Sequence, residues 1–246
     1  MIGIFYKLFR VIKYGKFKYL LSKSIVITEK GSFTDIARNT KIINSQIIVV
    51  KGGRLQIANN CVIKNIKMIV DGTVNMGEYN TIENGRVPMR EIVNVNKGTL
   101  IIGHHNRLRL KMIIRFGGIL SIGDYNNINE ESEIRSDERV SIGSFNQISY
   151  KCMIWDTNTH NIYSDEKRRE LTIKYFPSYG FEYEKPKTSP TIIGDDCWIG
   201  REAALLKGTI IGNSSIIGFK TILVNKVIEE GMTVVSKSDN MVFARK

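Results

Sequence analysis

The sequence predicts an all-β protein, a parallel β-helix of about eight to nine triangular coils. The first observation is an aliphatic residue at every sixth position from Ile193 to Leu223. Side chains of a strand alternate between its two faces, so an even spacing keeps these residues on one face. The second observation is a glycine directly after four of them and a small residue four places after five of them. A unit this short cannot bury its own apolar side chain, so successive units must stack.

The repeat also runs upstream, because aliphatic residues six apart recur in threes from Ile36 onward. Three hexads per coil give a prism with three faces. Three later coils open with a related motif: IGHHNRL at Ile102, IGDYNNI at Ile122 and IGSFNQI at Ile142. Their starts lie twenty residues apart instead of the eighteen of three strict hexads. This difference predicts a bulge of about two residues at one corner.

Two details of the repeat predict local structure. The coil that starts at Met76 has Pro88 where an aliphatic residue is due, so a loop is expected near Glu83 to Arg90. Asparagines at equivalent places in those three motifs and in MGEYNTI at Met76 are expected to stack as a ladder of turns; they are Asn80, Asn106, Asn126 and Asn146.

Composition excludes several classes of protein. The chain has 246 residues, 42% of them hydrophobic, and no apolar run approaches the ~18 residues that a transmembrane helix needs. The N-terminus lacks the cleavage site of a signal peptide, so a cytoplasmic protein is expected. The odd number of cysteines without metal-type spacing predicts reduced core residues, at Cys61, Cys152 and Cys197. The net charge of +12 indicates an anionic partner, but dispersed lysines without a recognised motif disfavour nucleic acid.

Residues 1–30 are expected to form a basic amphipathic segment that includes a short helix, and residues 31–246 the β-helix domain. Residues 1–23 contain six lysines or arginines and no acidic residue, and Ile4, Leu8 and Val11 share one helical face. The segment either caps the first coil, whose backbone groups would otherwise be unpaired, or rests peripherally on the inner face of an anionic membrane.

The repeat is interrupted once, after Ile154. The next hexad position falls on His160, and the pattern resumes only at Ile193. The intervening segment, near residues 161–190, is polar, aromatic and basic, which predicts one long loop excursion. A long loop that leaves and rejoins a regular scaffold usually serves function, so the residues at its base are candidates for a site.

The residues around this excursion resemble the hexapeptide-repeat acyltransferases, and among them the sugar and capsular polysaccharide O-acetyltransferases. The resemblance rests on WDTNTH from Trp155, KPKTSPTIIGDDCWIG from Lys185, and the hexads that follow to Val235. It implies a left-handed β-helix, usually a homotrimer, with acetyl-CoA between neighbouring prisms and a carbohydrate acceptor beside it. The implied activity is acetyl transfer to a hydroxyl of a sugar in a bacterial capsular or lipopolysaccharide glycan, without a metal.

Acetyl transfer from a thioester to an alcohol needs a base, and the resemblance assigns this role to His160. A neutral imidazole titrates near physiological pH, and a positioned general base contributes about 10² to 10⁴ in rate. Asp156 is expected either to orient the imidazole or to bond to backbone in the corner. Trp198, in the W-I-G of the family motif, is expected either to donate to the oxyanion or to cap the outside of a coil.

The phosphates of acetyl-CoA need cations or backbone donors. The resemblance assigns the cofactor to residues of the last coils: Trp198, Gly200, Arg201, Phe219, Lys220, Asn225 and Lys226. Asn225 replaces the usual lysine of the family, and KSDNMVFARK replaces its usual ending, so another acyl donor stays open. For the acceptor, the excursion offers aromatic faces and arginines that suit sugar rings and carboxylates, unless they pack the loop onto the next subunit; they are Tyr163, Arg168, Arg169, Tyr175 and Tyr179.

The sequence leaves three alternatives. The first is an N-acetyltransferase of a nucleotide-linked amino sugar, or an acetyltransferase of another small molecule. A zinc hydratase would need three converging histidines, whereas His104 and His105 are adjacent and alternate across a strand. An inactive β-helix that serves as a scaffold or binding module would keep the coils and need no base at His160.

Overall fold

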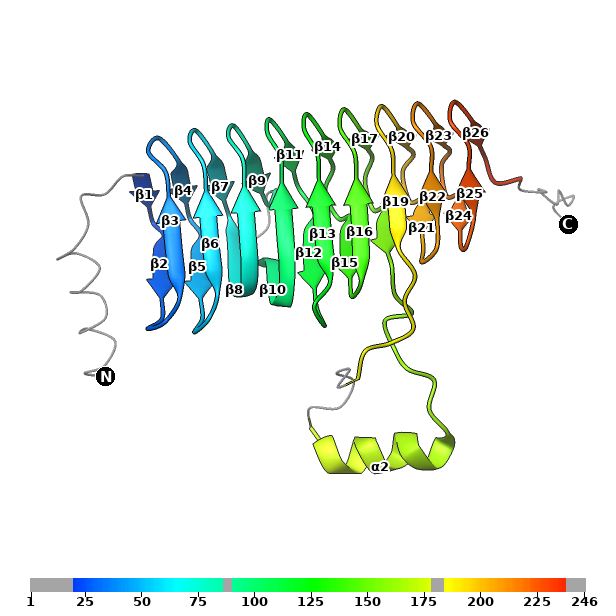
Figure 1. Cartoon of the computed structure of the whole chain (residues 1–246), viewed down its shortest axis with the longest axis horizontal. Helices are drawn as coiled ribbons and strands as arrows, with labels where there is room; N and C mark the ends of the chain where they lie inside the picture. Colours follow the sequence, from blue (N-terminus) through cyan, green and yellow to red (C-terminus); the bar gives the residue numbers. More distant parts are fainter. Residues whose placement is uncertain (1–19, 86–89, 178–183, 238–246) are drawn as a thin grey trace, which may run out of the picture.

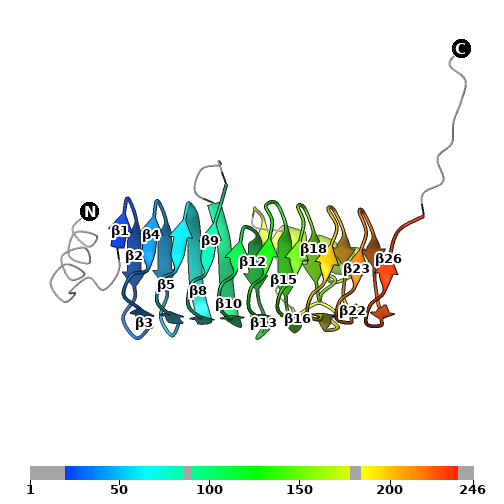
Figure 2. The same cartoon turned by 90° about the horizontal axis from the view of Figure 1, so that it is seen from above.

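The computed structural model describes residues 20–85, 90–177 and 184–237 and shows an elongated stack of coils (Figure 1). The coils follow one another in sequence order along the long axis, as the perpendicular view also shows (Figure 2). Strands of successive coils pair in parallel throughout the described residues. The parallel β-helix is therefore confirmed, and the architecture is consistent with the left-handed form.

The prism has three faces, which we name A, B and C in the order the chain visits them. Face A is a ten-stranded sheet with one strand per coil. Its strands are β1 (Leu20–Ser22), β4 (Lys41–Ile43), β7 (Val62–Lys64), β9 (Thr81–Glu83), β11 (Arg107–Leu108), β14 (Asn127–Ile128), β17 (Gln147–Ile148), β20 (Trp198–Ile199), β23 (Ile216–Ile217) and β26 (Thr233–Val234).

Faces B and C form one sheet of sixteen strands, because two strands run around the corner between them without a break. These strands are β8 (Ile66–Met76) and β10 (Arg90–Ile102). The others on face B are β2 (Ile25–Thr28), β5 (Gln46–Val49), β12 (Lys111–Ile114), β15 (Glu133–Ser136), β18 (Met153–Trp155), β21 (Ala204–Leu205) and β24 (Ile222–Leu223). The others on face C are β3 (Phe33–Ile36), β6 (Arg54–Ile57), β13 (Ile119–Ile122), β16 (Arg139–Ile142), β19 (Thr191–Ile193), β22 (Ile210–Ile211) and β25 (Val227–Ile228).

The core is a column of aliphatic side chains along the axis. The hexad residues from Ile193 to Ile217 are at most 1% exposed, and Leu223 is 8% exposed. Buried residues of successive coils stack in register; Leu205, for example, pairs with Ile154 of the preceding coil. Cys61, Cys152 and Cys197 are buried free thiols, as predicted, and burial raises the pKa of Cys152 to about 11.

The predicted asparagine ladder is present at the corner between faces C and A. The side-chain oxygen of Asn106 accepts from the backbone N–H of Asn126 at 2.8 Å, and that of Asn126 accepts from Asn146 at 2.9 Å. A second, exposed ladder runs beside it. The rings of Tyr79, His105, Tyr125 and Phe145 stack with centroids 4.7 to 5.1 Å apart. Both ladders stabilise the corner that the I-G-x-x-N motifs form.

Two expectations about the outline of the fold need correction. The number of coils is ten, because face A has ten strands, and not eight to nine. The first strands, β1 and β2, lie within residues 1–30, so the described coils begin at Leu20, eleven residues before the assigned boundary. The expected N-terminal helix and most of the basic segment lie outside the described residues. The loop near Glu83 to Arg90 falls between β9 and β10, with 86–89 outside the described residues.

The coils differ in length mainly at the corner between faces B and C, which we name corner BC. The inward residues on either side of it are eight positions apart in one coil, Ile134 and Ile142, and six apart in a later coil, Leu205 and Ile211. The predicted two-residue bulge is therefore at corner BC. The long excursion leaves the prism at the same corner, between β18 and β19 (Figure 1).

Candidate functional site

The excursion at corner BC is a hairpin-like projection that carries the helix α2 (Asp165–Tyr175). At its base, Thr157 and Thr188 form an antiparallel bridge, and the Asn158 N–H donates to the Lys187 carbonyl at 3.0 Å. Ser164 caps the helix by accepting from the Lys167 N–H. No residue of α2 is buried, and Figure 1 shows the helix projecting away from the coils. The sequence predicted the excursion but not its helix.

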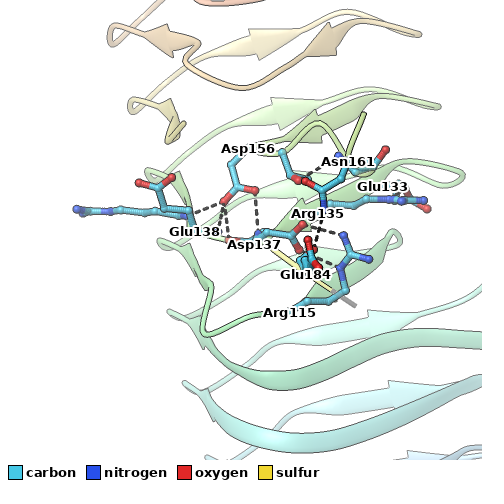
Figure 3. A network of polar contacts seen from close by, with 12 residues as sticks. Arg115, Glu133, Arg135, Asp137, Glu138, Asp156, Asn161 and Glu184 are labelled. Atoms are coloured by element: carbon cyan, nitrogen blue, oxygen red, sulfur yellow. Dashed lines mark hydrogen bonds and ion pairs between the residues drawn. The ribbon is translucent and has the colours of Figure 1, made fainter. Parts of the chain in front are cut away.

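Asp156 ties the base of the excursion to the coil below. Its carboxylate is fully buried and accepts from the backbone N–H groups of Asp137 and Glu138, both at 2.8 Å, and of Arg139 at 2.5 Å (Figure 3). The Ser136 hydroxyl donates to the same carboxylate at 3.2 Å. The structure thus gives Asp156 the corner-bonding role that the sequence left open. Orientation of His160 by Asp156 stays a prediction.

The position of Asp156 has an electrostatic consequence. Burial raises the pKa of its carboxyl above the ordinary value, and the three backbone N–H donors oppose the rise. The neighbouring Asp137 is also fully buried, and the Arg115 guanidinium binds it in bidentate fashion at 2.9 and 2.7 Å. The acidic pair under the excursion is therefore held by one arginine and a set of backbone donors.

His160 lies at the base of the excursion with an exposed side chain. Thr159, directly before it, is buried, and its N–H donates to the Thr157 hydroxyl at 3.0 Å. After it, the Asn161 side chain donates to the Glu184 carbonyl at 3.0 Å, which joins the two arms of the excursion. A buried threonine and a cross-arm bond therefore flank the imidazole, which meets solvent at the corner.

Trp198 is not near His160 within one chain. It lies on face A, in β20, between Gln147 of β17 and Ile216 of β23, and its side chain is 59% exposed. In a three-sided prism, face A is opposite corner BC, where His160 lies. The two residues that the sequence grouped as catalytic therefore occupy opposite sides of the prism.

The residues assigned to the cofactor divide between two corners. Gly200, Arg201, Phe219 and Lys220 lie where face A turns into face B, and Glu202 pairs there with Arg201 at 3.2 Å and with Lys220 at 3.6 Å. Asn225 and Lys226 lie at corner BC instead, two coils beyond the excursion, where the Asn225 N–H donates to the Lys207 carbonyl at 3.0 Å. One chain therefore does not assemble these six residues into one groove.

The residues assigned to the acceptor are spread along the excursion. The Tyr163 hydroxyl donates to the Glu184 carboxylate at 3.4 Å, and Arg168 pairs with Asp165 at 2.9 Å on α2. Arg169 is exposed on the same helix, and Tyr175 is its last residue. Tyr179 lies outside the described residues.

The other two histidines lie at the corner between faces C and A. His104 accepts from the Glu78 N–H at 3.0 Å, and His105 stacks between Tyr79 and Tyr125. Among the described residues, no three His, Cys, Asp or Glu side chains are grouped so that they would hold a metal ion. In the same residues, no helix has the length and apolar character to cross a membrane.

Two solved structures are similar to this one over most of the chain. The polySia specific acetyltransferase NeuO is 14% identical, with 93% of this chain and 90% of that chain covered and a TM-score of 0.45. The polysialic acid O-acetyltransferase OatWY is 17% identical, with the same coverage and a TM-score of 0.40. No family model and no curated protein matches the sequence. At these values neither likeness decides the activity of the chain.

Two residues beside the excursion were not predicted to have a role. Trp155 ends β18, and Arg135 lies directly below it in β15 with its guanidinium carbon 4.8 Å from the ring centroid. Their spacing of twenty residues was the available signal, since it equals the coil length and places both on the outside of face B. Trp155 also directly precedes Asp156, so the pair belongs to the base of the excursion.

Proposed function

We propose that the chain is an acetyl-CoA-dependent O-acetyltransferase that esterifies a hydroxyl of a sugar in a bacterial surface glycan, with His160 as general base. One observation carries this proposal: an exposed imidazole stands where a long excursion opens an otherwise closed prism, on a base fixed by buried Asp156 and Thr159. Rigid coils hold the base of the site, and exposed helix α2 offers adaptable contacts for a glycan.

The proposed reaction needs no group beyond the two substrates and His160 to account for every proton and every bond. The imidazole accepts the proton of the sugar hydroxyl as its oxygen attacks the thioester carbon. The tetrahedral oxyanion needs a donor, for which the indole N–H of Trp198 is proposed. Collapse breaks the carbon–sulfur bond, and the imidazolium returns the proton to the leaving thiolate. The products are a sugar acetate and free CoA, and the histidine is regenerated.

The opposite positions of His160 and Trp198 support a site between two copies of the chain. A contact between corner BC of one copy and face A of the next is heterologous, and such a contact closes into a ring when the rotation allows it. We therefore propose a homotrimer in which each site takes His160 from one copy and Trp198 from its neighbour. Arg201 and Lys220, at the edge of face A, would then approach the acetyl-CoA phosphates.

The test is acetyl transfer from acetyl-CoA to purified surface glycans, followed by mass spectrometry. Wild type is expected to add acetyl groups that mild alkali removes, as esters require; an alkali-stable product would indicate an amide. His160→Ala is expected to lower kcat/KM by about 10² to 10⁴ with an unchanged circular dichroism spectrum. The matched control is Asn158→Ala, which removes an exposed side chain from the same base. Full activity of His160→Ala would contradict the proposal.

A further inference from the structure

Trp155 and Arg135 form a stacked pair on face B, next to the corner that carries His160. The ring and the guanidinium lie one above the other in register, with 4.8 Å between the guanidinium carbon and the ring centroid. Both residues are half-buried, and the Arg135 side chain is 25% exposed. A second pair of the same kind, Arg54 over Phe33 at 5.0 Å, occurs in the early coils. The stacking itself therefore belongs to the fold.

Trp155 carries one of the six buried side-chain polar atoms that have no hydrogen-bond partner among the described residues. Its indole nitrogen is inaccessible to solvent and makes no hydrogen bond within the described part of the chain. A buried N–H that is left unpaired costs free energy, so proteins rarely keep one without a use. Phenylalanine, as in the Arg54–Phe33 pair, would give the same stacking without that cost. Tryptophan at this position therefore indicates an acceptor group that reaches the indole N–H.

Arg135 supplies a second set of donors at the same place. Its Nε–H donates to Glu133 at 2.5 Å, and its terminal amino groups make no hydrogen bond among the described residues. Lys111 also approaches Glu133, at 3.5 Å, so these three charged groups sum to one positive charge. A guanidinium with free terminal amino groups binds carboxylates through paired N–H donors. The acceptor group indicated here is therefore anionic.

The pair lies where a bound glycan would pass. Trp155 precedes His160 by five residues, and the Arg135 carbonyl accepts from the backbone N–H of Asp156, at the base of the excursion, at 3.2 Å. The excursion is joined to the coils mainly through backbone bonds at its base, and its helix buries nothing. Because the indole nitrogen is inaccessible to solvent, binding at this place requires local movement of the atoms that cover it.

We infer that Trp155 and Arg135 form a subsite for the carboxylate of an acidic sugar, which places the acceptor glycan on the His160 corner. This inference rests on the proposed function and names its substrate class as an acidic glycan. In it, the indole N–H and the terminal amino groups of Arg135 donate to the two carboxylate oxygens. Sugars without a carboxylate lack the group that satisfies these donors.

The experiment follows the NMR signal of the Trp155 indole N–H. The chain has two tryptophans, so a ¹H–¹⁵N spectrum contains two indole signals, which Trp155→Phe and Trp198→Phe assign. The probe is glucuronate at millimolar concentration, compared with glucose. Glucuronate is expected to move the Trp155 signal downfield and glucose to leave it in place. A Trp155 signal unmoved by glucuronate would overturn the inference.

Calorimetric titration with glucuronate measures the contribution of each residue. Arg135→Gln and Trp155→Phe are each expected to weaken binding about tenfold, while Arg54→Gln, the matched control, leaves it unchanged. Trp155→Phe is also expected to keep or raise the urea midpoint of unfolding, because it removes an unpaired buried donor. A lower midpoint with unchanged glucuronate binding would mean a structural role and would reject the subsite.

This result is independent of acetyl transfer. Wild type without acetyl transfer to any glycan, or His160→Ala with full activity, together with an intact glucuronate response, would refute the acetyltransferase proposal and keep the subsite. Normal acetyl transfer that depends on His160, with no glucuronate response, would keep the enzyme and reject the subsite.

Discussion

Two consecutive coils turn corner BC in different ways, and the difference explains the aspartate of the motif. In the coil of β15 and β16, which is closed at this corner, backbone carbonyls accept from N–H groups of the coil below. The Ser136 carbonyl accepts from the Arg115 N–H, and the Glu138 carbonyl accepts from the Ile119 N–H, both at 3.0 Å. In the next coil the chain leaves the prism, so most of the carbonyls that would accept from residues 137–139 are displaced. The Asp156 carboxylate takes those N–H groups instead.

This comparison teaches what opening a β-helix requires. Backbone N–H groups that face a removed turn must find another acceptor, because unpaired buried donors are costly. One carboxylate with two oxygens replaces several carbonyls at the cost of burying a charge. The same exchange lets His160 leave the coil on a fixed base, so stability at this corner and the candidate chemistry meet in one short motif.

The largest effect on stability is expected from a substitution at the corner where the excursion leaves the coils. Asp156→Ala leaves three backbone N–H groups without their acceptor, so the free energy of unfolding should fall by about 3 kcal/mol or more. Urea denaturation at fixed protein concentration measures the change. Asp165→Ala is the control, since its exposed carboxylate pairs with Arg168 on the surface of α2, and its effect should stay below about 0.5 kcal/mol. Equal stability of the two variants would contradict the role given to Asp156.

A smaller effect is expected from pH. Because burial raises the pKa of Asp156 in the folded state, the stability it contributes is fully present below its unfolded pKa, near 3.9, and is lost as pH rises through the folded pKa. Relative to Asp156→Asn, which does not titrate, wild type should lose at most about 1.4 kcal/mol per pH unit in that window. Urea unfolding of both proteins across the window tests the sign. A rising wild-type advantage would show that the backbone donors outweigh burial.

The smallest effect is expected outside the prism. Ile173 is 80% exposed on α2, so Ile173→Ser should change the free energy of unfolding by less than about 0.5 kcal/mol. Leu205 is fully buried in the coils, and Leu205→Ala should cost about 3 kcal/mol. Parallel urea titrations compare the two. A large loss for Ile173→Ser would mean that α2 packs on the coils or on another copy.

The sequence predicted the coils better than the site. Spacing of six is a local pattern, and it identified buried residues such as Ile199 and Ile217 correctly. Coils with weaker spacing were missed, which is why β1 and β2 fell in the segment assigned to the cap. The grouping of His160 with Trp198 came from a family motif, and spacing alone does not say on which face of the prism a residue lies.

The pair Trp155 and Arg135 is a second feature that spacing in the sequence did not predict. Trp155 opens the WDTNTH motif, but neither residue breaks the repeat, so no local pattern pairs the two. Only the register between β15 and β18 brings them together, and that register depends on the length of corner BC. Residues that act through stacking between coils need the coil length before they can be found.

The most direct test of a site shared between copies is subunit complementation. His160→Ala and Trp198→Ala chains, each inactive alone, are mixed, unfolded together, refolded and assayed for acetyl transfer to glycan. Mixed assemblies contain sites that pair an intact His160 with an intact Trp198 from a neighbour, so the proposal predicts that activity returns to a substantial fraction of wild type. Activity in the mixture no higher than in either variant refolded alone would contradict it.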